Sequence, residues 1–311
     1  MRPLPLRGRG DLLIRMSHPI GPASADSASV LLAWSAEPAV TIPVAVAAAL
    51  YWRGWMALSR RLPHRFGPLR LLAFMAGLAV VVLAVCSPID ALGRHLLRAH
   101  MTQHLLLMLV APPLLWAGAP LAPLLLGLPR PLRRMVAGIL AASPMRRLTA
   151  WLTHPAVGWV LFVVAFWLWH VPALYELALR SDGWHHVEHM VFFGTAMLFW
   201  RPVILAWPAR SPWPRWAMIP YLVLAEMQNT ALAAILTFSD RVVYPAYLAA
   251  PRAGGLSPLE DQAVAGLIMW VPGSLAFLIP VLWLVITGLH SPDRGADRTA
   301  AIDGQPALRR R

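Results

Sequence analysis

Apolar residues along this chain gather in long unbroken runs, separated by short segments that carry most of the charge. Seven runs can be distinguished, at about residues 38–58, 68–88, 98–121, 154–175, 185–207, 216–238 and 262–289. Each is close to the ~20 residues with which a helix crosses the hydrocarbon core of a bilayer. In lipid, only helices and closed barrels satisfy all backbone hydrogen bonds. Such runs are too long and too uniformly apolar for barrel strands, so they are expected to be helices. The pattern predicts an all-α integral membrane protein, a bundle of about seven transmembrane helices.

The segments outside these runs are expected to be less ordered. We expect residues 1–37 to form a disordered N-terminal tail, 38–290 the seven-helix transmembrane domain, and 291–311 a disordered cytoplasmic C-terminal tail. The N-terminal tail has no compact apolar core of the kind that marks a signal peptide. Met16 is an alternative to Met1 as the translation start, because residues 1–15 add four arginines and little else.

Four prolines follow the third run and predict that its end is broken. They are Pro120, Pro123, Pro129 and Pro131. Proline interrupts a helix because it lacks the amide hydrogen and its ring clashes with the preceding turn. We therefore expect a short re-entrant or interfacial piece at this point.

Arginines are unevenly shared among the connections between the runs, which predicts the orientation of the chain. The connections after the first, third and fifth runs and the C-terminal tail hold Arg60, Arg61, Arg65, Arg70, Arg130, Arg133, Arg134, Arg146, Arg147, Arg201, Arg210, Arg215, Arg294, Arg298, Arg309, Arg310 and Arg311. The alternate connections hold only Arg94, Arg98, Arg180, Arg241 and Arg252. Short cytoplasmic loops carry the excess of basic residues. The C-terminus is therefore predicted to be cytoplasmic and, with an odd number of crossings, the N-terminus outside.

Composition supports the membrane interpretation and argues against a nucleic-acid-binding protein and against a protein built on paired cysteines. The chain is 58% hydrophobic, and all 27 of its basic residues are arginine. A net charge of +13 would indicate nucleic acid in a soluble protein, but here the arginines lie in loops between apolar runs, so we expect no nucleic-acid partner. The single cysteine, Cys86, excludes an internal disulfide and any metal motif built on paired cysteines.

Histidines gather at the predicted outer ends of the runs. His100 and His104 lie in the first two turns of the third run, and His185 and His189 in those of the fifth. His170 lies near the outer end of the fourth run. On the same side, Asp261 and Gln262 open the seventh run, whereas the predicted cytoplasmic ends carry His64, His154 and His290. Ionisable groups inside membrane spans are costly and indicate a functional site.

The spacing of these histidines favours a small transition-metal ion. His100 and His104 are four residues apart, as are His185 and His189, so each pair shares one face of a helix. Imidazole suits copper, zinc or iron, and thioether ligands favour Cu(I). Met108 continues the stripe of His100 and His104 one turn deeper, Met101 falls on an adjacent face, and the residues that could extend a relay inward are Met227, Asn229 and Met269.

Each of these residues also has a plainer interpretation. A lone interfacial histidine can hydrogen-bond a carbonyl group or a lipid headgroup, and most methionines fill space in the core. We expect Glu188 to orient a neighbouring imidazole and Asp90 to cap a helix. His186 and Cys86 are weaker candidates than the other donors, and Cys86 is equally well read as an inert buried residue. The metal hypothesis therefore rests on the grouping of several histidines at one depth.

Five ordered motifs carry a family resemblance over roughly residues 40–290. They are Ser87-Pro88-Ile89-Asp90, His100-Met101-Thr102-Gln103-His104-Leu105-Leu106, Trp169-His170-Val171-Pro172, His185 to His189 followed by Trp200-Arg201-Pro202, and Asp261-Gln262 to Gly273. In these stretches the chain resembles the CtaG family of caa3-type cytochrome c oxidase assembly factors. The resemblance implies a multi-pass protein of the bacterial plasma membrane that helps copper reach a haem–copper oxidase. It also implies a transient oxidase-subunit partner, a periplasmic copper chaperone as donor, and the metal-binding set His100, His104, His170, His185, His189 and Asp261.

Two alternatives to copper delivery stay open on the sequence alone. In a b-type haem electron carrier, His170 and His189 would be axial ligands, since they come from different runs. A copper transporter would use the same donors, although no internal repeat is evident. We expect no enzymatic activity, because no nucleophile, base and orienting group occur together and the string from His185 to His189 lacks the His-Glu-x-x-His spacing of metalloproteases.

Overall fold

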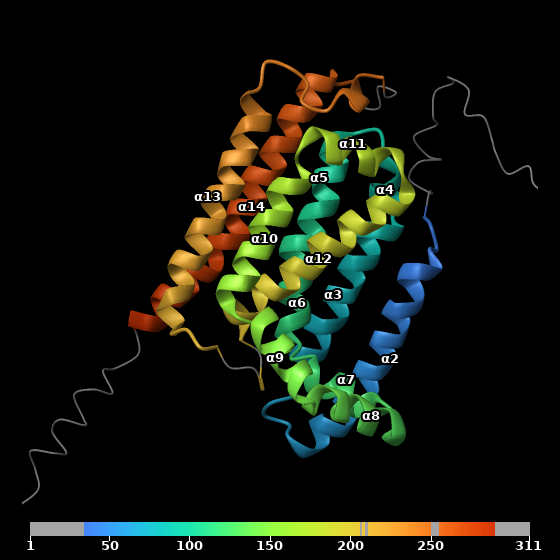
Figure 1. Ribbon diagram of the computed structural model, residues 1–311, viewed down its shortest axis with the longest axis vertical. Coiled ribbons are helices and arrows are strands. Elements are labelled where there is room, and N and C mark those ends of the chain that lie inside the picture. Colours follow the sequence, from blue (N-terminus) through green and yellow to red (C-terminus); the bar gives the residue numbers. More distant parts are fainter. Residues whose placement is uncertain (1–33, 206, 209–210, 250–254, 290–311) are drawn as a thin grey trace, which may run out of the picture.

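The computed structural model describes residues 34–205, 207–208, 211–249 and 255–289, and within these ranges the chain consists of helices without any strand (Figure 1). The all-α prediction is therefore confirmed. Most of the two predicted tails lies outside the described residues. Of the N-terminal tail, residues 34–37 are described, and the Ser35 amide donates to the Cys86 carbonyl at 2.9 Å.

Every predicted apolar run is helical. Six of the runs correspond to α2 (Pro38–Arg61), α3 (Pro68–Cys86), α10 (Pro155–Trp169), α12 (Asp182–Ile204), α13 (Met218–Phe238) and α14 (Pro258–Leu289). The third run is composite and comprises α5 (Leu97–Leu105), the π-helix η1 (Leu106–Val110) and α6 (Ala111–Ala117). The connections contain the short helices α4 (Pro88–Gly93), α7 (Leu121–Gly127), α8 (Arg130–Ala141), α9 (Ser143–Leu152), α11 (Pro172–Arg180), η2 (Arg215–Ala217) and η3 (Pro245–Leu248).

Length and apolarity alone identify fewer crossings than the seven predicted. Among the described residues, three helices are long and apolar enough by themselves: Pro68–Cys86, Arg215–Phe238 and Pro258–Leu289. Two bent pairs raise the number to five, Leu97–Ala117 with Leu121–Gly127 at 70° and Ser143–Leu152 with Pro155–Trp169 at 62°. Helices α2 and α12, of 24 and 23 residues, are long enough but too polar to qualify. The count of seven and the orientation therefore stay predictions.

Prolines explain where several helices begin and where the fourth run ends. Helices α2, α3, α4, α10 and α11 each have proline in their first two positions, where its fixed φ suits the helix and its missing amide hydrogen is not needed. The residue before a proline disfavours helical geometry. Val171, which precedes Pro172, is accordingly extended with ψ of 125°. Helix α10 therefore ends at Trp169, earlier than the predicted 175, and His170 lies at the break.

A proline also reshapes the third run directly below the histidines. An amide at position 112 would donate to the Met108 carbonyl, but Pro112 has no such hydrogen. The Met108 carbonyl instead accepts the indole N–H of Trp200 at 2.9 Å, and the wider turn of η1 directly precedes this point. This bond fixes α12 against the third run one turn below His104.

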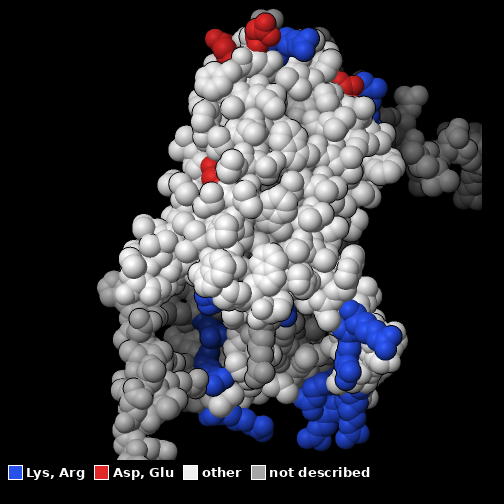
Figure 2. Space-filling model, turned by 60° about the vertical axis from the view of Figure 1, so that its left-hand side comes forward, with Lys and Arg blue, Asp and Glu red and all other residues white. Residues whose placement is uncertain are grey.

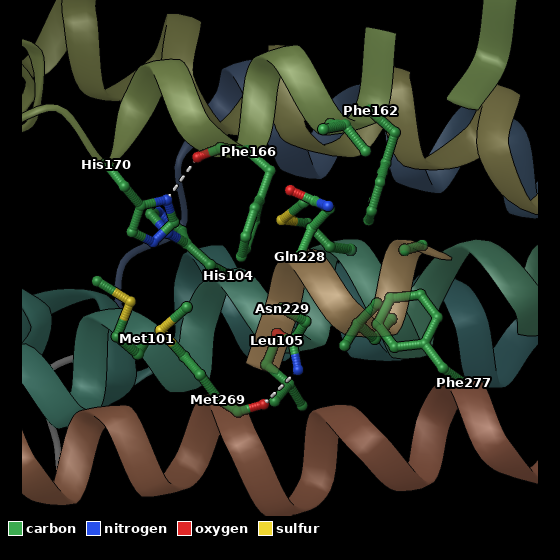
Figure 3. A pocket seen from close by; sticks show the side chains of 14 residues that line it. Met101, His104, Leu105, Phe162, Phe166, His170, Gln228, Asn229, Met269 and Phe277 are labelled. Atoms are coloured by element: carbon green, nitrogen blue, oxygen red, sulfur yellow. Dashed lines mark hydrogen bonds between the residues drawn. The ribbon is translucent and has the colours of Figure 1, made fainter. Parts of the chain in front are cut away.

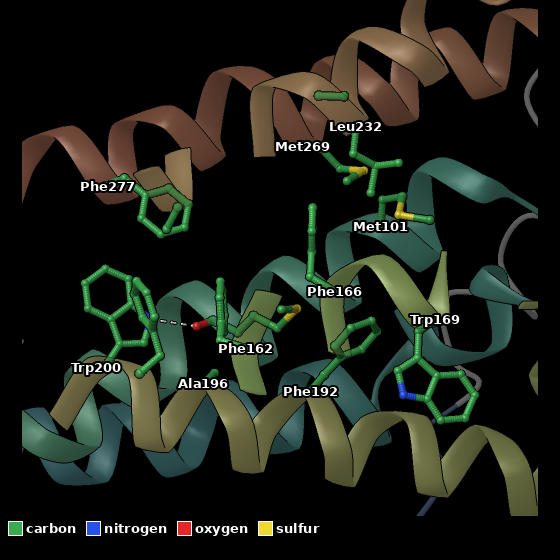
Figure 4. Close-up of a cluster of buried hydrophobic side chains, with 14 of the residues drawn as sticks. Met101, Phe162, Phe166, Trp169, Phe192, Ala196, Trp200, Leu232, Met269 and Phe277 are labelled. Atoms are coloured by element: carbon green, nitrogen blue, oxygen red, sulfur yellow. Dashed lines mark hydrogen bonds between the residues drawn. The ribbon is translucent and has the colours of Figure 1, made fainter. Parts of the chain in front are cut away.

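Aromatic rings fill the middle of the bundle and close the space beneath the histidines. Phe162 of α10 stacks on Phe199 of α12 with ring centroids 4.3 Å apart. Trp200 lies parallel to Phe277 of α14 at 5.9 Å (Figure 4). These rings belong to the largest buried apolar cluster of the described residues. The core therefore separates the two ends of the bundle.

Helices α2 and α7 approach each other until their backbones meet. A Cβ atom on Gly54 would lie 1.9 Å from the Pro123 carbonyl oxygen, and one on Gly127 would lie 2.0 Å from the Leu50 carbonyl oxygen. Only glycine allows this separation, which is the usual reason for small residues at helix contacts in membranes. The contact fixes the break that the prolines after the third run predicted.

Charge is sorted between the two ends of the molecule. Figure 2 shows basic side chains gathered at the lower end, acidic side chains mostly at the upper end, and a broad uncharged band between them. The lower end carries α8 and α9, none of whose residues is buried. The upper end carries α4, α11 and the start of α12 (Figure 1). We call this upper end the histidine end.

Candidate metal centre

Buried polar side chains from two helices meet at the histidine end. Helix α5 contributes His100 and His104, and α12 contributes His185, Glu188 and His189. All five are buried, Glu188 fully, with 0% of its surface exposed. The four-residue spacing predicted a shared face within each pair, and the structure also brings the two pairs against each other. We call these five residues the His/Glu cluster.

The imidazole rings pack directly on one another. Ring centroids are 4.2 Å apart for His100 and His104, and 4.1 Å for His185 and His189. Between the helices, His100 lies 5.4 Å from His185, and His104 lies 5.6 Å from His189. The carboxylate of Glu188 sits among them, with Oε2 3.7 Å from His100 Nε2 and 3.8 Å from His104 Nε2.

The donor atoms of the cluster lack hydrogen-bond partners. Nε2 of each of the four histidines is buried and unpartnered, as is Nε2 of His170, and both carboxylate oxygens of Glu188 are unpartnered as well. A buried polar atom without a partner costs about 1–3 kcal/mol, and more when it is charged. Such a concentration of unpaired acceptors fits a bound cation, which would satisfy several of them together.

The donors form overlapping sets of the size that a metal ion requires. The structure places His100, His185 and Glu188 with ligand atoms within 4.8 Å of one another, and the same holds for His104, Glu188 and His189. A third set joins Asp90 to His185 and His189. Glu188 and the two histidines of α12 are each shared between sets, so the cluster is a continuous group of donors.

Backbone bonds fix the tautomers of two of the rings. His170 Nδ1 lies 2.6 Å from the Phe166 carbonyl oxygen, so this nitrogen carries the proton and Nε2 carries the lone pair. His100 is likewise bonded to the backbone of Gly93, and its Nε2 is the unpartnered nitrogen. A ring whose Nδ1 carries the proton leaves Nε2 deprotonated, with the lone pair that a metal ion binds.

A group of tyrosines covers the cluster from the histidine end. The Tyr247 hydroxyl donates to the Gly93 carbonyl at 2.9 Å and lies 2.8 Å from the hydroxyl of Tyr175, whose ring is 5.0 Å from that of His100. Tyr244 donates to the His170 carbonyl at 3.1 Å. Burial raises the pKa of Tyr247 far above its ordinary value, so the phenol stays protonated and donates at neutral pH. The tyrosines close the cluster against water.

Asp261 is placed differently from the other predicted ligands. Its Oδ2 accepts the backbone amides of Leu97 and Arg98 at 2.7 and 3.4 Å, and its Oδ1 pairs with the Arg98 guanidinium at 2.9 Å. A carboxylate at this position caps the N-terminus of α5 and complements its dipole. Asp261 therefore holds the helix that carries His100 and His104, and it joins none of the donor sets of the described residues.

The remaining candidates have partners of their own. Gln262 accepts from the Val243 amide at 2.7 Å and donates to the Leu236 carbonyl at 3.2 Å, so it holds the loop that carries the tyrosines. His186 faces away from the cluster and pairs with Glu37 at 2.5 Å. Asp90 accepts the Gln103 amide at 2.7 Å. Cys86 is buried and free.

Glu188 is the candidate residue whose surroundings the sequence did not reveal. The prediction was a carboxylate that orients an imidazole by a hydrogen bond, but neither of its oxygens makes one. It lies between the two histidine pairs and belongs to two donor sets. The available signal was its position three residues after His185, which places both on one face of α12.

Comparisons with known proteins agree with this arrangement of motifs. A family model, cytochrome c oxidase caa3 assembly factor (Caa3_CtaG), matches residues 49–291. Uncharacterized proteins of Mycobacterium bovis and Mycobacterium tuberculosis are each 28% identical over 285 residues, covering 87% of this chain and 42% of theirs. One from Mycobacterium leprae is 25% identical over 256 residues, covering 75% of this chain and 37% of its own.

The chain thus spans less than half the length of these curated relatives. No solved structure matches it. The family match, in contrast, covers all of the described helices that hold the His/Glu cluster. On this match the chain belongs to the family of cytochrome c oxidase caa3 assembly factors.

Proposed function

We propose that this protein binds copper at the His/Glu cluster and passes it to a haem–copper oxidase during assembly of that enzyme. One observation carries the proposal: a fully buried carboxylate without a hydrogen bond is surrounded by four imidazoles whose Nε2 atoms are also unpartnered. The family supplies the oxidase as the partner. Copper is here the cargo, and a periplasmic copper chaperone would be its donor.

Charge balance favours the monovalent ion. Four neutral imidazoles and one ionised carboxylate carry a single negative charge, which Cu(I) would neutralise. A buried site without net charge avoids most of the desolvation cost that an isolated ion has in a low-dielectric interior. Imidazole is a good ligand for copper, and the absence of thiolates among the described donors lets the ion exchange rather than remain trapped.

The packing of the rings disfavours the haem alternative. The imidazoles touch one another across the two helices, and the cavity beside them has a volume of about 30 Å³. This is room for one ion or water molecule and not for a macrocycle. Copper delivery therefore fits the geometry better than a b-type haem held by His170 and His189.

Alanine substitutions in the cluster test the delivery role. We expect His104→Ala and His189→Ala, made in the host that carries the oxidase, to lower the copper content and the activity of the oxidase in isolated membranes. Purified His104→Ala protein should also bind less Cu(I). His95→Ala is the matched control, since His95 lies near the same end but is exposed. An oxidase with its full copper content in the His104→Ala and His189→Ala strains would refute the delivery role.

A further inference from the structure

A small cavity lies next to the His/Glu cluster, on the side away from α12. It lies among α5, η1, α10, α13 and α14 and is lined by Met101, His104, Met108, His170, Asn229 and Met269, among others (Figure 3). Its volume of about 30 Å³ matches one small ion or water molecule. The cavity therefore has the size and the wall of a binding site for a single ion.

Two imidazoles at one end of this cavity have nitrogens to offer. His170 is locked with Nδ1 towards the Phe166 carbonyl, which leaves the buried lone pair of Nε2. Both ring nitrogens of His104 are buried without a partner. Because an imidazole has two nitrogens on opposite sides, His104 can turn one towards Glu188 and present the other to the cavity.

Two thioethers face the same end. Met101 of α5 and Met269 of α14 are 1% and 6% exposed. Figure 3 shows their side chains extending towards the rings of His104 and His170, and Figure 4 shows the two methionines side by side from another direction. Methionine often only fills space in a core. Here, however, the two methionines line the same cavity as His104 and His170, whose Nε2 atoms have no hydrogen-bond partner.

We propose that this cavity is a second copper station, a Cu(I) site formed by His104, His170, Met101 and Met269. Thioether and imidazole together select the soft monovalent ion, whereas the carboxylate of the His/Glu cluster accepts harder ions as well. His104 belongs to both stations through its two ring nitrogens, so the two ion positions lie on either side of one imidazole, and transfer breaks the bond to one nitrogen and forms a bond to the other. The inference rests on the proposed copper-handling function and adds to it an inner, copper-selective site.

Electrostatics allow the inner station to hold the ion. Its four ligands are neutral, so the bound Cu(I) would bring one positive charge into the bundle. The Glu188 carboxylate lies 3.8 Å from the Nε2 atom of His104 and balances that charge across the shared ring. A station built only from imidazoles and thioethers therefore remains compatible with a low-dielectric surrounding.

Copper K-edge absorption of the purified full-length protein, loaded anaerobically with one equivalent of Cu(I), tests the assignment. We expect nitrogen and sulfur ligands in the wild type. In Met101→Leu/Met269→Leu, which nearly conserves volume, the sulfur contribution should disappear, and competition with a Cu(I) chelator should show binding roughly tenfold weaker or more. Met190→Leu is the matched control, because Met190 is 65% exposed on α12.

The outcomes separate this station from the His/Glu cluster. A sulfur contribution to the copper spectrum that persists in Glu188→Gln would support an inner station that binds Cu(I) without the carboxylate as a ligand. Nitrogen and oxygen ligands alone in the wild type, with no effect of the double methionine variant, would overturn the inner station and leave the cluster standing. Sulfur that persists in Met101→Leu/Met269→Leu would also overturn the assignment. A wild-type protein that binds no Cu(I) would refute both sites.

Discussion

Glu188 offers the sharpest test, because its replacement should stabilise the empty protein while it destroys a binding site. The side chain is fully buried, and neither of its oxygens has a hydrogen-bond partner. Glutamine has the same shape without the charge. Its amide group can donate to the Nε2 atoms of His100 and His104, which lie 3.7 and 3.8 Å from the carboxylate. We therefore expect Glu188→Gln to relieve acceptors that are unpaired in the metal-free wild type.

The expected magnitude follows from the number of unpaired atoms. Each buried unpaired polar group costs about 1–3 kcal/mol, so relief of one or two should stabilise the metal-free protein by roughly 1–6 kcal/mol. A bound ion stabilises the wild type by about 2.7 kcal/mol at a concentration one hundred times Kd. In a chain of this size, 1 kcal/mol shifts Tm by roughly 2–4 °C. Both effects are therefore measurable in thermal unfolding.

The assay is thermal unfolding of detergent-purified protein with and without Zn(II). Zinc binds imidazole and carboxylate in proteins and does not depend on thioethers, so it reports the His/Glu cluster alone. We expect metal-free Glu188→Gln to melt above the metal-free wild type, and zinc to raise the Tm of the wild type only. Glu176→Gln is the matched control, because Glu176 pairs with Arg180 at the molecular surface.

Three results would refute this reasoning. A metal-free Glu188→Gln protein that melts several degrees below the wild type would mean that the carboxylate is needed for the fold. A full zinc response in the same variant would mean that the cluster binds without its central carboxylate. The same response in Glu176→Gln as in Glu188→Gln would trace the effect to net charge rather than to the site.

Two further substitutions test the frame that holds the site. Asp261→Ala removes the cap of α5 and should lower the stability by about 2–4 kcal/mol. The folded fraction should still bind zinc. Loss of zinc binding at unchanged Tm would instead make Asp261 a ligand. Gly54→Ala places a Cβ atom 1.9 Å from the Pro123 carbonyl oxygen and should destabilise by about 1–3 kcal/mol in thermal unfolding. Gly138→Ala, with nothing within 4 Å, is its control, and equal Tm values for the two variants would contradict the packing argument.

The apolar runs were enough to predict the seven long helical segments, because they act through local backbone physics, whereas the short helices of the connections were not predicted. The pairing of His100 with His104 and of His185 with His189 was also predictable, since a helix fixes which residues share a face. What joins the two pairs is the packing of α5 against α12 through η1 and α6, and no local pattern contains that information.

Roles that depend on long-range neighbours could not be predicted for the same reason. Asp261 had the residue type and depth of a ligand, yet α14 delivers it to the start of α5, where two backbone amides donate to its Oδ2 and the Arg98 guanidinium pairs with its Oδ1. Glu188 had the residue type of an orienting group, yet it lies where no donor reaches it. In both cases the chemistry was recognisable and the partner was not.

The cap on α5 also has a consequence for biogenesis. Asp261 is 164 positions beyond Leu97 in the chain, on α14, which is the last of the described helices to be synthesised. Until that helix has been synthesised, the Leu97 and Arg98 amides in the first turn of α5 lack the carboxylate that accepts them. The N-terminal end of α5 therefore obtains its cap only when translation of the bundle is nearly complete.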